Sequence, residues 1–366
     1  MRKYCCIALL WLSVSLLLGM ENVGSQLEFC PTRKAYIQHV VANKNSEVPK
    51  CFFCDKDSLK NNYILNEDAD KDVRVMMNKS PYPDFDQAIH LLFMPIVHKE
   101  LPHDFSKLDL MHQIDSVHTI SQKLDCKSYS QEWFTNWGKL GGQTVAHWHS
   151  QLKIFTQPSC SMPERMKRVK DFSIKNIEDA FEKTKELLNV CPDSLPNPLH
   201  DGKVMRFYKE CLCCMIKNGK ENNVDNNDKD NFVVARFLHN YICLSHYPSV
   251  AGEICVVPNR HVAAIKDLSQ EELRENMILA MALLPKMKEY AQINIRQCDG
   301  GNLYTKSVGN KASKNQQEAY HMCTVIMPRT IISSTPGTKN RNSCKLDYDP
   351  NHLYAYLKET IKNINM

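Results

Sequence analysis

Residues 145–155, VAHWHSQLKIF, place two histidines and a glutamine at alternate positions and end in an apolar run. The β-branched and aromatic content of this run predicts a strand over Val145–Phe155. Side chains alternate between the two faces of a strand, so His147, His149 and Gln151 share one face. Three polar side chains on one face predict a functional site there.

The residue types suit phosphoryl chemistry. A neutral imidazole at His149 is a competent nucleophile toward a phosphoryl group. Gln151 cannot take up a proton, but its amide can donate a hydrogen bond to a phosphate oxygen and stabilise the charge that develops. Gly138, Gly141 and Gly142, just upstream, leave room for backbone amides to approach a phosphate.

The histidine pair belongs to a series of motifs that occurs twice. Each series contains CxxC, a histidine three residues after a proline, an asparagine and a second histidine. The first series is Cys51, Cys54, His98, Asn136 and His147, and the second is Cys211, Cys214, His261, Asn310 and His321. The second cysteine precedes the first histidine by 44 and 47 residues, and eleven residues separate each asparagine from its histidine. The repeated order predicts an internal duplication.

Each series holds the ligand set of a tetrahedral zinc site. Two thiolates in CxxC can clasp one ion, and two imidazoles from distant strands complete a Cys2His2 set. The duplication favours metal over a disulfide or packed thiols, because incidental cysteines have no reason to recur with matched histidines. We therefore expect zinc at Cys51, Cys54, His98 and His147, and at Cys211, Cys214, His261 and His321.

The elements predicted between the motifs follow a similar order in the two halves. The first half holds strands at Val73–Asn78, His90–Pro95 and Val145–Phe155 and a helix from Ser106 to about Leu124. The second holds β runs at Phe232–Leu244 and Glu253–Val257, a helix after the Ser269 capping box and a strand at Ala319–Met327. A linker helix at Phe172–Val190 joins them.

The second half lacks the catalytic pair. Its aligned segment, residues 321–325, reads HMCTV. Cys323 stands where the first half has His149, and Val325 stands where it has Gln151. We expect this half to be catalytically silent.

The N-terminus and the composition bear on location. Arg2 and Lys3 precede an apolar run to Leu18 and small residues near Ser25, as in a secretory signal peptide. This predicts a secreted or periplasmic protein, with an uncleaved membrane anchor as the alternative and no membrane contact after cleavage. A net charge of +5 over 366 residues, without a clustered basic stripe, argues against a nucleic-acid partner. The sequence leaves a homodimer open.

With these motifs the sequence resembles the histidine-triad (HIT-like) superfamily, over about residues 27 to 335. Within it the chain is similar to the duplicated galactose-1-phosphate uridylyltransferase branch of nucleotidyltransferases and phosphorylases, which carries HxHxQ. Trp148 stands where the uridylyltransferases have proline, so diadenosine polyphosphate and nucleotide-sugar phosphorylases remain alternatives. A bulky Trp148 indicates an altered wall or packing on the opposite face of the strand.

The resemblance implies a fold and a set of roles. It implies an α+β chain of two tandem HIT-like repeats, each an antiparallel sheet with a packed helix. His149 is then the covalent nucleophile that carries a nucleoside monophosphate, with Gln151 on the phosphate. Asn78 and Asn136 contact the nucleotide, and Thr144 lies against the phosphates.

The expected domains are a signal peptide at 1–25, a catalytic half at 26–170, a linker helix at 171–200, a silent half at 201–335 and a C-terminal extension at 336–366. The expected function is transfer of a nucleoside monophosphate from a nucleotide sugar or dinucleoside polyphosphate to a phosphate acceptor. Two alternatives stay open. One is a HIT-like nucleotide hydrolase, and the other is a secreted, zinc-stabilised nucleotide-binding module without catalysis.

Overall fold

The computed structural model describes the regions of the chain that carry most of the predicted motifs. These are residues 51–55, 63–78, 88–138, 141–143, 145–157, 174–190, 213–214, 233–245, 248, 250–294, 298–312, 314–330 and 349–362. The predicted signal peptide, Thr144 and Cys211 lie outside the described residues. Among the described helices, none is long and apolar enough to cross a membrane.

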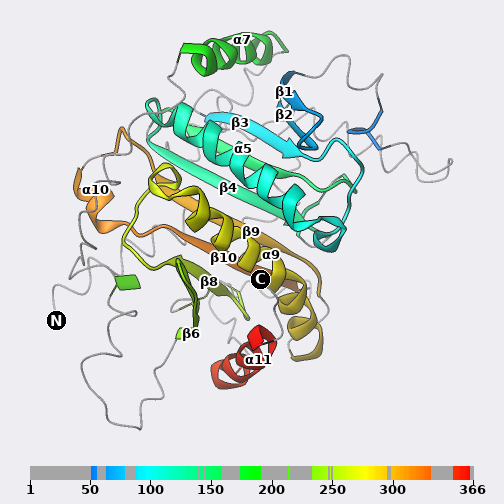
Figure 1. The fold of residues 1–366 in the computed structure, drawn as a ribbon, viewed down its shortest axis with the longest axis vertical. Coiled ribbons are helices and arrows are strands. Elements are labelled where there is room, and N and C mark those ends of the chain that lie inside the picture. Colours follow the sequence, from blue (N-terminus) through cyan, green and yellow to red (C-terminus); the bar gives the residue numbers. More distant parts are fainter. Residues whose placement is uncertain are drawn as a thin grey trace, which may run out of the picture.

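The described chain is a mixed α+β structure built on one ten-stranded sheet whose neighbouring strands are antiparallel (Figure 1). The strands are β1 (Ile64–Asp68), β2 (Val73–Met77), β3 (Ala88–Met94), β4 (Ser130–Trp137), β5 (Ser150–Phe155), β6 (Val233–Arg236), β7 (Asn240–Leu244), β8 (Ile254–Pro258), β9 (Cys298–Val308) and β10 (Cys323–Thr330). Their order across the sheet is β1-β2-β3-β5-β4-β9-β10-β8-β7-β6.

This order is the same from either edge of the sheet inwards. The sequence β1-β2-β3-β5-β4 on one side corresponds to β6-β7-β8-β10-β9 on the other. The two sides join along β4 and β9, which pair antiparallel from Ser130 opposite Val308 to Trp137 opposite Gly301. Residues of β9 therefore lie directly beside those of β4 in the middle of the sheet.

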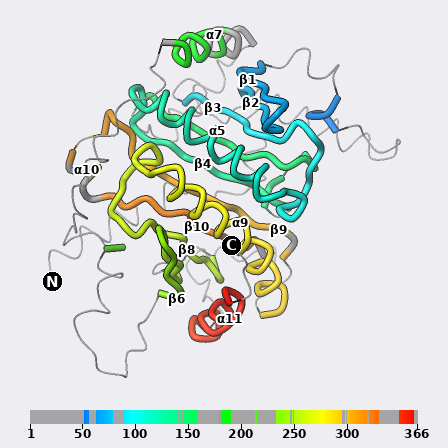
Figure 2. Tube along the Cα trace, in the orientation of Figure 1, coloured from blue at the N-terminus to red at the C-terminus, as the bar shows by residue number. Residues whose placement is uncertain are grey.

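Two long helices cover one face of the sheet (Figures 1 and 2). They are α5 (Lys107–Asp125) and α9 (Gln270–Asn294), and the short 3-10 turns η2 (Pro102–Asp104) and η3 (Ile265–Asp267) precede them. The other helices in the described ranges are α7 (Ile174–Val190), α10 (Lys314–Ala319) and α11 (Pro350–Lys362). Ser106 and Ser269 cap α5 and α9, and each side chain accepts a backbone N–H three residues later, as in a capping box.

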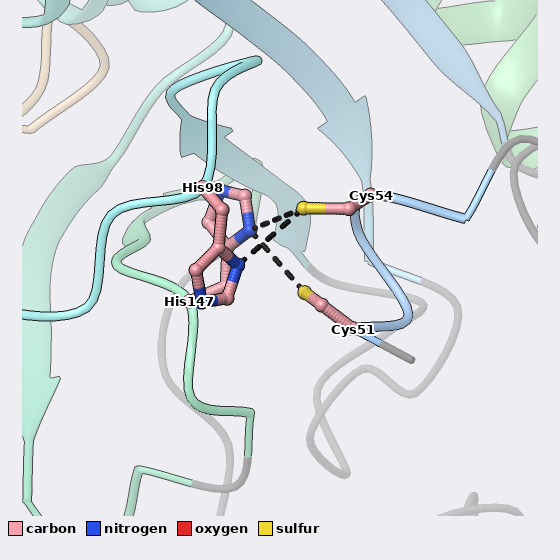
Figure 3. A group of neighbouring side chains, drawn as sticks. All are labelled: Cys51, Cys54, His98 and His147. Atoms are coloured by element: carbon pink, nitrogen blue, oxygen red, sulfur yellow. Dashed lines mark hydrogen bonds between the residues drawn. The ribbon is translucent and has the colours of Figure 1, made fainter. Parts of the chain in front are cut away.

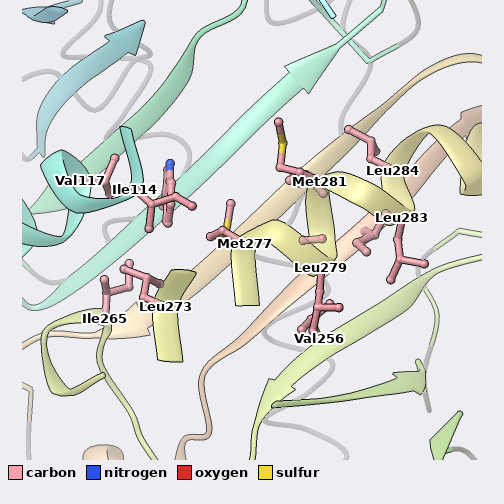
Figure 4. Close-up of a cluster of buried hydrophobic side chains, with 14 of the residues drawn as sticks. Ile114, Val117, Val256, Ile265, Leu273, Met277, Leu279, Met281, Leu283 and Leu284 are labelled. Carbon is pink, nitrogen blue, oxygen red and sulfur yellow. The ribbon is translucent and has the colours of Figure 1, made fainter. Parts of the chain in front are cut away.

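The main hydrophobic core lies between the helices and the sheet. Leu273, Met277 and Leu284 of α9 are buried there together with Ile114 and Val117 of α5 (Figure 4). Alternate residues of β5, such as Leu152 and Ile154, point into the same core. The intervening residues of β5 therefore face the opposite side of the sheet, where the candidate site lies.

The predicted elements match the observed ones with several differences. The strand predicted over Val145–Phe155 begins at Ser150, so the two histidines lie in the segment just before it. The run Phe232–Leu244 is two strands, β6 and β7. The last predicted strand begins at Cys323 rather than at Ala319, which is the last residue of α10. The central strands β4 and β9 were not predicted.

Candidate active site and metal centre

Four predicted zinc ligands lie together at the end of the sheet near β3 (Figure 3). They are Cys51, Cys54, His98 and His147, and their ligand atoms all lie within 4.8 Å of one another. His147 Nδ1 is 3.3 Å from Cys51 Sγ and 3.4 Å from Cys54 Sγ. His98 Nδ1 is 3.4 Å from Cys54 Sγ. In a tetrahedral zinc site, bond lengths near 2.3 and 2.05 Å put sulfur and nitrogen about 3.5 Å apart, so this geometry fits zinc.

The histidines present the correct nitrogen to such an ion. His147 Nε2 donates to the backbone oxygen of Pro95 at 2.9 Å, and His98 Nε2 lies 3.0 Å from a carboxylate oxygen of Glu100. Because these partners are acceptors, Nδ1 of each ring keeps its lone pair for the metal. Burial lowers the pKa of His147 to about 4, so its imidazole is neutral at physiological pH.

The thiols are also consistent with a cation. Burial and the neighbouring Cys51 thiol raise the pKa of Cys54 to about 11. Two thiols held this close resist ionisation, because the second thiolate would face the charge of the first. A divalent ion reverses this preference by favouring both thiolates.

The cysteine segment also contacts the second histidine of the pair. Phe53, between the two cysteines, is 4% exposed and sets its ring 5.7 Å from His147 and 5.4 Å from His149, between centroids. Arg74 donates to the Phe53 backbone oxygen at 2.8 Å and pairs with Glu67 at 2.7 Å. Phe53 therefore packs against both histidines and connects the CxxC segment with His149.

His149 is held in one tautomer. Its Nδ1 lies 2.8 Å from the backbone oxygen of His147, which can only accept, so Nδ1 carries the proton. The other nitrogen, Nε2, is therefore the unprotonated nitrogen of the neutral ring. This is the form that a nucleophilic imidazole requires.

Gln151 lies on the same side of the sheet and is 6% exposed. Its Oε1 is 2.9 Å from Nε2 of His90, which is itself 3% exposed. The Asn78 amide nitrogen lies 3.4 Å from both ring nitrogens of His90. Because Oε1 accepts from His90, the Gln151 amide nitrogen is left to donate elsewhere in the site.

Asn136 and Lys153 complete the described part of this face. Asn136 follows Thr135, whose partner in β5 is Ser150, so Asn136 lies beside His149. Lys153 is 8% exposed, and its ammonium lies 5.9 Å from the centre of the Phe134 ring. This face therefore combines the imidazole of His149 with amide side chains and a buried lysine, groups that can interact with a phosphate ester. Trp148 is 2% exposed and packs 5.9 Å from Phe105 in the core, on the opposite face of the sheet.

A second cluster lies in the second half. Cys214 Sγ is 3.4 Å from His261 Nδ1 and 3.5 Å from His321 Nδ1. His321 Nε2 lies 3.2 Å from the Pro258 backbone oxygen. This contact corresponds to that of His147 Nε2 with the Pro95 backbone oxygen, at 2.9 Å. These three predicted ligands come together, and the fourth, Cys211, lies outside the described residues.

One sequence match does not hold in three dimensions. Asn136 sits inside β4, whereas Asn310 lies in an exposed turn after the end of β9. The eleven-residue spacing is thus a coincidence, because the two segments before the second histidines follow different paths. Sequence reasoning missed His90, Asn302 and Arg329, which the strand register brings to the site.

Comparison with known proteins identifies the fold. No protein-family model matches the chain, and no curated protein sequence matches it. Among solved structures, the chain is similar to an ADP-glucose phosphorylase from Arabidopsis thaliana with bound ADP-glucose, with a TM-score of 0.55, 16% identity and coverage of 87% of this chain and 93% of that one. A mutant uridylyltransferase gives a TM-score of 0.56 at 14% identity, covering 88% and 94%. A GalT-like protein from Arabidopsis thaliana gives 0.55 at 16%, covering 85% and 92%.

The chain therefore has the α+β fold shared by uridylyltransferases and ADP-glucose phosphorylase. This is the fold that the resemblance to the galactose-1-phosphate uridylyltransferase branch of the histidine-triad superfamily predicted, and the prediction is confirmed at that level.

Proposed function

We propose that this chain is a nucleotidyltransferase or phosphorylase that carries a nucleoside monophosphate on His149. The observation that supports it best is the hydrogen bond from His149 Nδ1 to the His147 backbone oxygen, at 2.8 Å. It leaves Nε2 unprotonated and ready to attack, with no base needed to remove a proton. Gln151 nearby supplies the donor that a phosphate oxygen requires.

In the first half-reaction, His149 Nε2 attacks the α-phosphorus of the donor. A P–N bond forms while the bond to the leaving phosphate oxygen breaks, and the leaving group departs as a phosphate or sugar phosphate. The imidazole becomes cationic and keeps its Nδ1 proton. The His147 carbonyl oxygen, which accepts that proton in a hydrogen bond, stabilises the new charge.

In the second half-reaction, an oxygen of an acceptor phosphate attacks the same phosphorus. The P–N bond breaks and its electron pair returns to Nε2, which restores the neutral ring. Gln151 donates its amide N–H to the phosphoryl oxygens in both steps, and Lys153 adds positive charge to this face of the sheet. Asn78, Asn136 and Thr144 are proposed to contact the nucleotide, Thr144 from outside the described residues.

We propose zinc as the resident metal of the Cys51, Cys54, His98 and His147 cluster. The ion supplies a structural clamp there, joining the CxxC segment to the histidine that precedes the nucleophile. The matching cluster of Cys211, Cys214, His261 and His321 is proposed to hold a second ion. Neither role asks the metal to take part in the bond changes.

The neighbours suggest the substrate class. ADP-glucose is bound in the phosphorylase of the same fold, which supports a nucleotide sugar as donor and a phosphate or sugar phosphate as acceptor. A dinucleoside polyphosphate is the alternative donor.

The mirrored strand order supports an internal duplication, with halves at 26–170 and 201–335 joined by the linker at 171–200. The 1–25 signal peptide and export are proposed as well, and N-terminal sequencing of the secreted chain tests them.

An isotope-exchange experiment tests the reaction. The chain is incubated with unlabelled ADP-glucose or UDP-glucose and labelled glucose 1-phosphate, with no other acceptor. A covalent nucleotidyl intermediate returns label to the nucleotide sugar, and His149→Ala abolishes the exchange. Release of free nucleoside monophosphate without exchange indicates the hydrolase. Nucleotide binding without either reaction indicates the binding module and refutes the proposal.

A further inference from the structure

The second half contacts the candidate site through Asn302 of β9. Asn302 is 7% exposed and lies opposite Asn136 in the register of β4 and β9. Its Nδ2 donates to Asn136 Oδ1 at 2.8 Å and to the backbone oxygen of Gly141 at 2.8 Å. Asn302, in the half expected to be silent, thus contacts both Asn136 and the segment of Gly141 and Gly142, here called the glycine loop, in the catalytic half.

The direction of these bonds is fixed by Arg329 of β10. Arg329 Nε donates to Asn302 Oδ1. A guanidinium has donors and no acceptor, so the oxygen of Asn302 must face Arg329 and its nitrogen must face Asn136. Burial lowers the pKa of Arg329 to about 10, which leaves it charged at neutral pH.

The hydrogen bond from Asn302 also orients the side-chain amide of Asn136. Its Oδ1 accepts from Asn302, so its Nδ2 is turned toward Gly142. A Cβ placed on Gly142 would lie 3.9 Å from that Nδ2. Gln151 is arranged alike, because His90 occupies its Oε1. Both amides therefore present N–H groups to the site, as an anionic ligand requires.

The backbone packing at this point leaves no room for adjustment. A Cβ on Gly141 would lie 2.1 Å from the Trp137 backbone oxygen and 2.6 Å from that of Gly301. The glycine loop thus rests directly on β9, and Asn302 ties it there. These close contacts block any movement of the loop further toward β9.

We propose that Arg329 and Asn302 are positioning residues, contributed by the second half, that fix Asn136 and the Gly141 loop with their donors toward the phosphates of the bound nucleotide. The inference rests on the proposed nucleotide-binding function of the site. It gives the catalytically silent half a defined task at the active site of the other half.

The test is the isosteric change Asn302→Asp. The carboxylate still accepts from Arg329, but it cannot donate to Asn136 or to Gly141. Asn136 then turns its Nδ2 toward residue 302 and presents its oxygen to the phosphates. We expect the Kd for ADP and for UDP, measured by calorimetry, to rise about 10- to 100-fold, the loss of one hydrogen bond to a charged group. In an Asn136→Ala background the same change has a smaller effect, because only the hydrogen bond to the Gly141 backbone oxygen is left to lose.

Asn276→Asp is the matched control. Asn276 is fully buried, and its Nδ2 donates to Asn240 Oδ1 at 2.8 Å in a second Asn–Asn pair, between α9 and β7 on the helix-covered face. We expect it to lower the unfolding temperature but to leave both Kd values unchanged. Should Asn302→Asp fail to fold, Arg329→Met replaces it, with an expected loss of about threefold to tenfold because Asn302 is then free to rotate.

The outcomes separate this inference from the proposed function. If the wild-type chain binds ADP or UDP and Asn302→Asp binds it equally well, the positioning role is refuted and the proposed function stands. An equal loss in Asn276→Asp also refutes it, since the effect would then come from general destabilisation. If the wild-type chain binds neither nucleotide, the proposed function is refuted and the positioning role with it.

Discussion

Replacing His90 with phenylalanine tests how Gln151 is oriented. The ring of His90 is 3% exposed, and its Nε2 is 2.9 Å from Gln151 Oε1. Phenylalanine keeps a ring of similar size but removes the donor. Gln151 can then turn its oxygen toward the phosphate, which replaces an attraction by a repulsion.

The loss of the His90 donor to the buried Gln151 has two expected costs, one in folding stability and one in rate. Leaving the Gln151 carbonyl without a donor at 6% exposure costs about 1–3 kcal/mol of folding stability. Weakening the hydrogen bond from the Gln151 amide to a charged phosphoryl group costs about 1.5–3 kcal/mol in the transition state. This corresponds to a rate about 10- to 100-fold lower. The loss of rate in His90→Phe cannot exceed the loss caused by Gln151→Ala. In the Gln151→Ala background, His90→Phe causes no further loss of rate.

The assay is the single-turnover rate of nucleotidyl-enzyme formation, with thermal unfolding of the same samples. His118→Phe is the control, because His118 is also buried and lies 3.2 Å from a glutamine amide, Gln122, but within α5 and outside the site. We expect it to change stability and leave the rate as it is. A wild-type rate in His90→Phe, or an equal loss in His118→Phe, would show that His90 does not orient Gln151.

Three further outcomes are expected. Burial raises the pKa of Asp125 from 3.8 to about 7, so the folded state binds a proton that the unfolded state has lost, and stability falls as pH rises through this range. Asp125→Asn removes this dependence of stability on pH, as measured by urea unfolding at several pH values. Cys51→Ser lowers the zinc content of the purified chain by elemental mass spectrometry, whereas Cys126→Ser, outside both clusters, leaves it unchanged; equal zinc in both variants would contradict the metal site. Gly141→Ala places a methyl group against the Trp137 backbone oxygen and costs about 3 kcal/mol in chemical denaturation, and a cost near zero would contradict the close packing of the loop.

The clustering of the two cysteines with the two histidines could be predicted because metal chemistry limits the spacing of such residues. A tetrahedral ion needs two thiols close in sequence and two histidines at the ends of strands, and this pattern persisted in both halves. Alternation around His149 placed Gln151 on the same face, as observed. The strand itself begins later than expected, at Ser150, after bends at residues 145–147, but Trp148 still packs into the core on the face opposite Gln151.

The central strands could not be predicted, because polar residues occupy their buried positions. In β4, Gln131 and Thr135 are 1% and 2% exposed, and Gln131 donates to the Ser121 backbone oxygen at 3.1 Å. In β9, Thr305 is 1% exposed and its hydroxyl lies 2.7 Å from that of Thr324. Such positions read as polar in sequence, so the apolar alternation of a strand is hidden.

Missing these two strands also hid the junction of the halves. The contact between Asn136 and Asn302 depends on the register of β4 against β9, which joins residues 166 positions apart. No local pattern encodes that register. The motif that did repeat in sequence, Asn310, lies elsewhere, because equal spacing does not ensure an equal path of the chain.

The covalent role of His149 is tested most directly by the mass of the intact chain after incubation with a nucleotide sugar. Wild-type protein, His149→Ala and Cys323→Ala are each incubated with ADP-glucose, UDP-glucose or a dinucleoside polyphosphate, and the adduct is located by peptide mapping. We expect a gain of one nucleoside monophosphate on His149 in the wild type and in Cys323→Ala, and none in His149→Ala. No adduct with any donor in zinc-loaded protein, or an adduct that persists in His149→Ala, would contradict it.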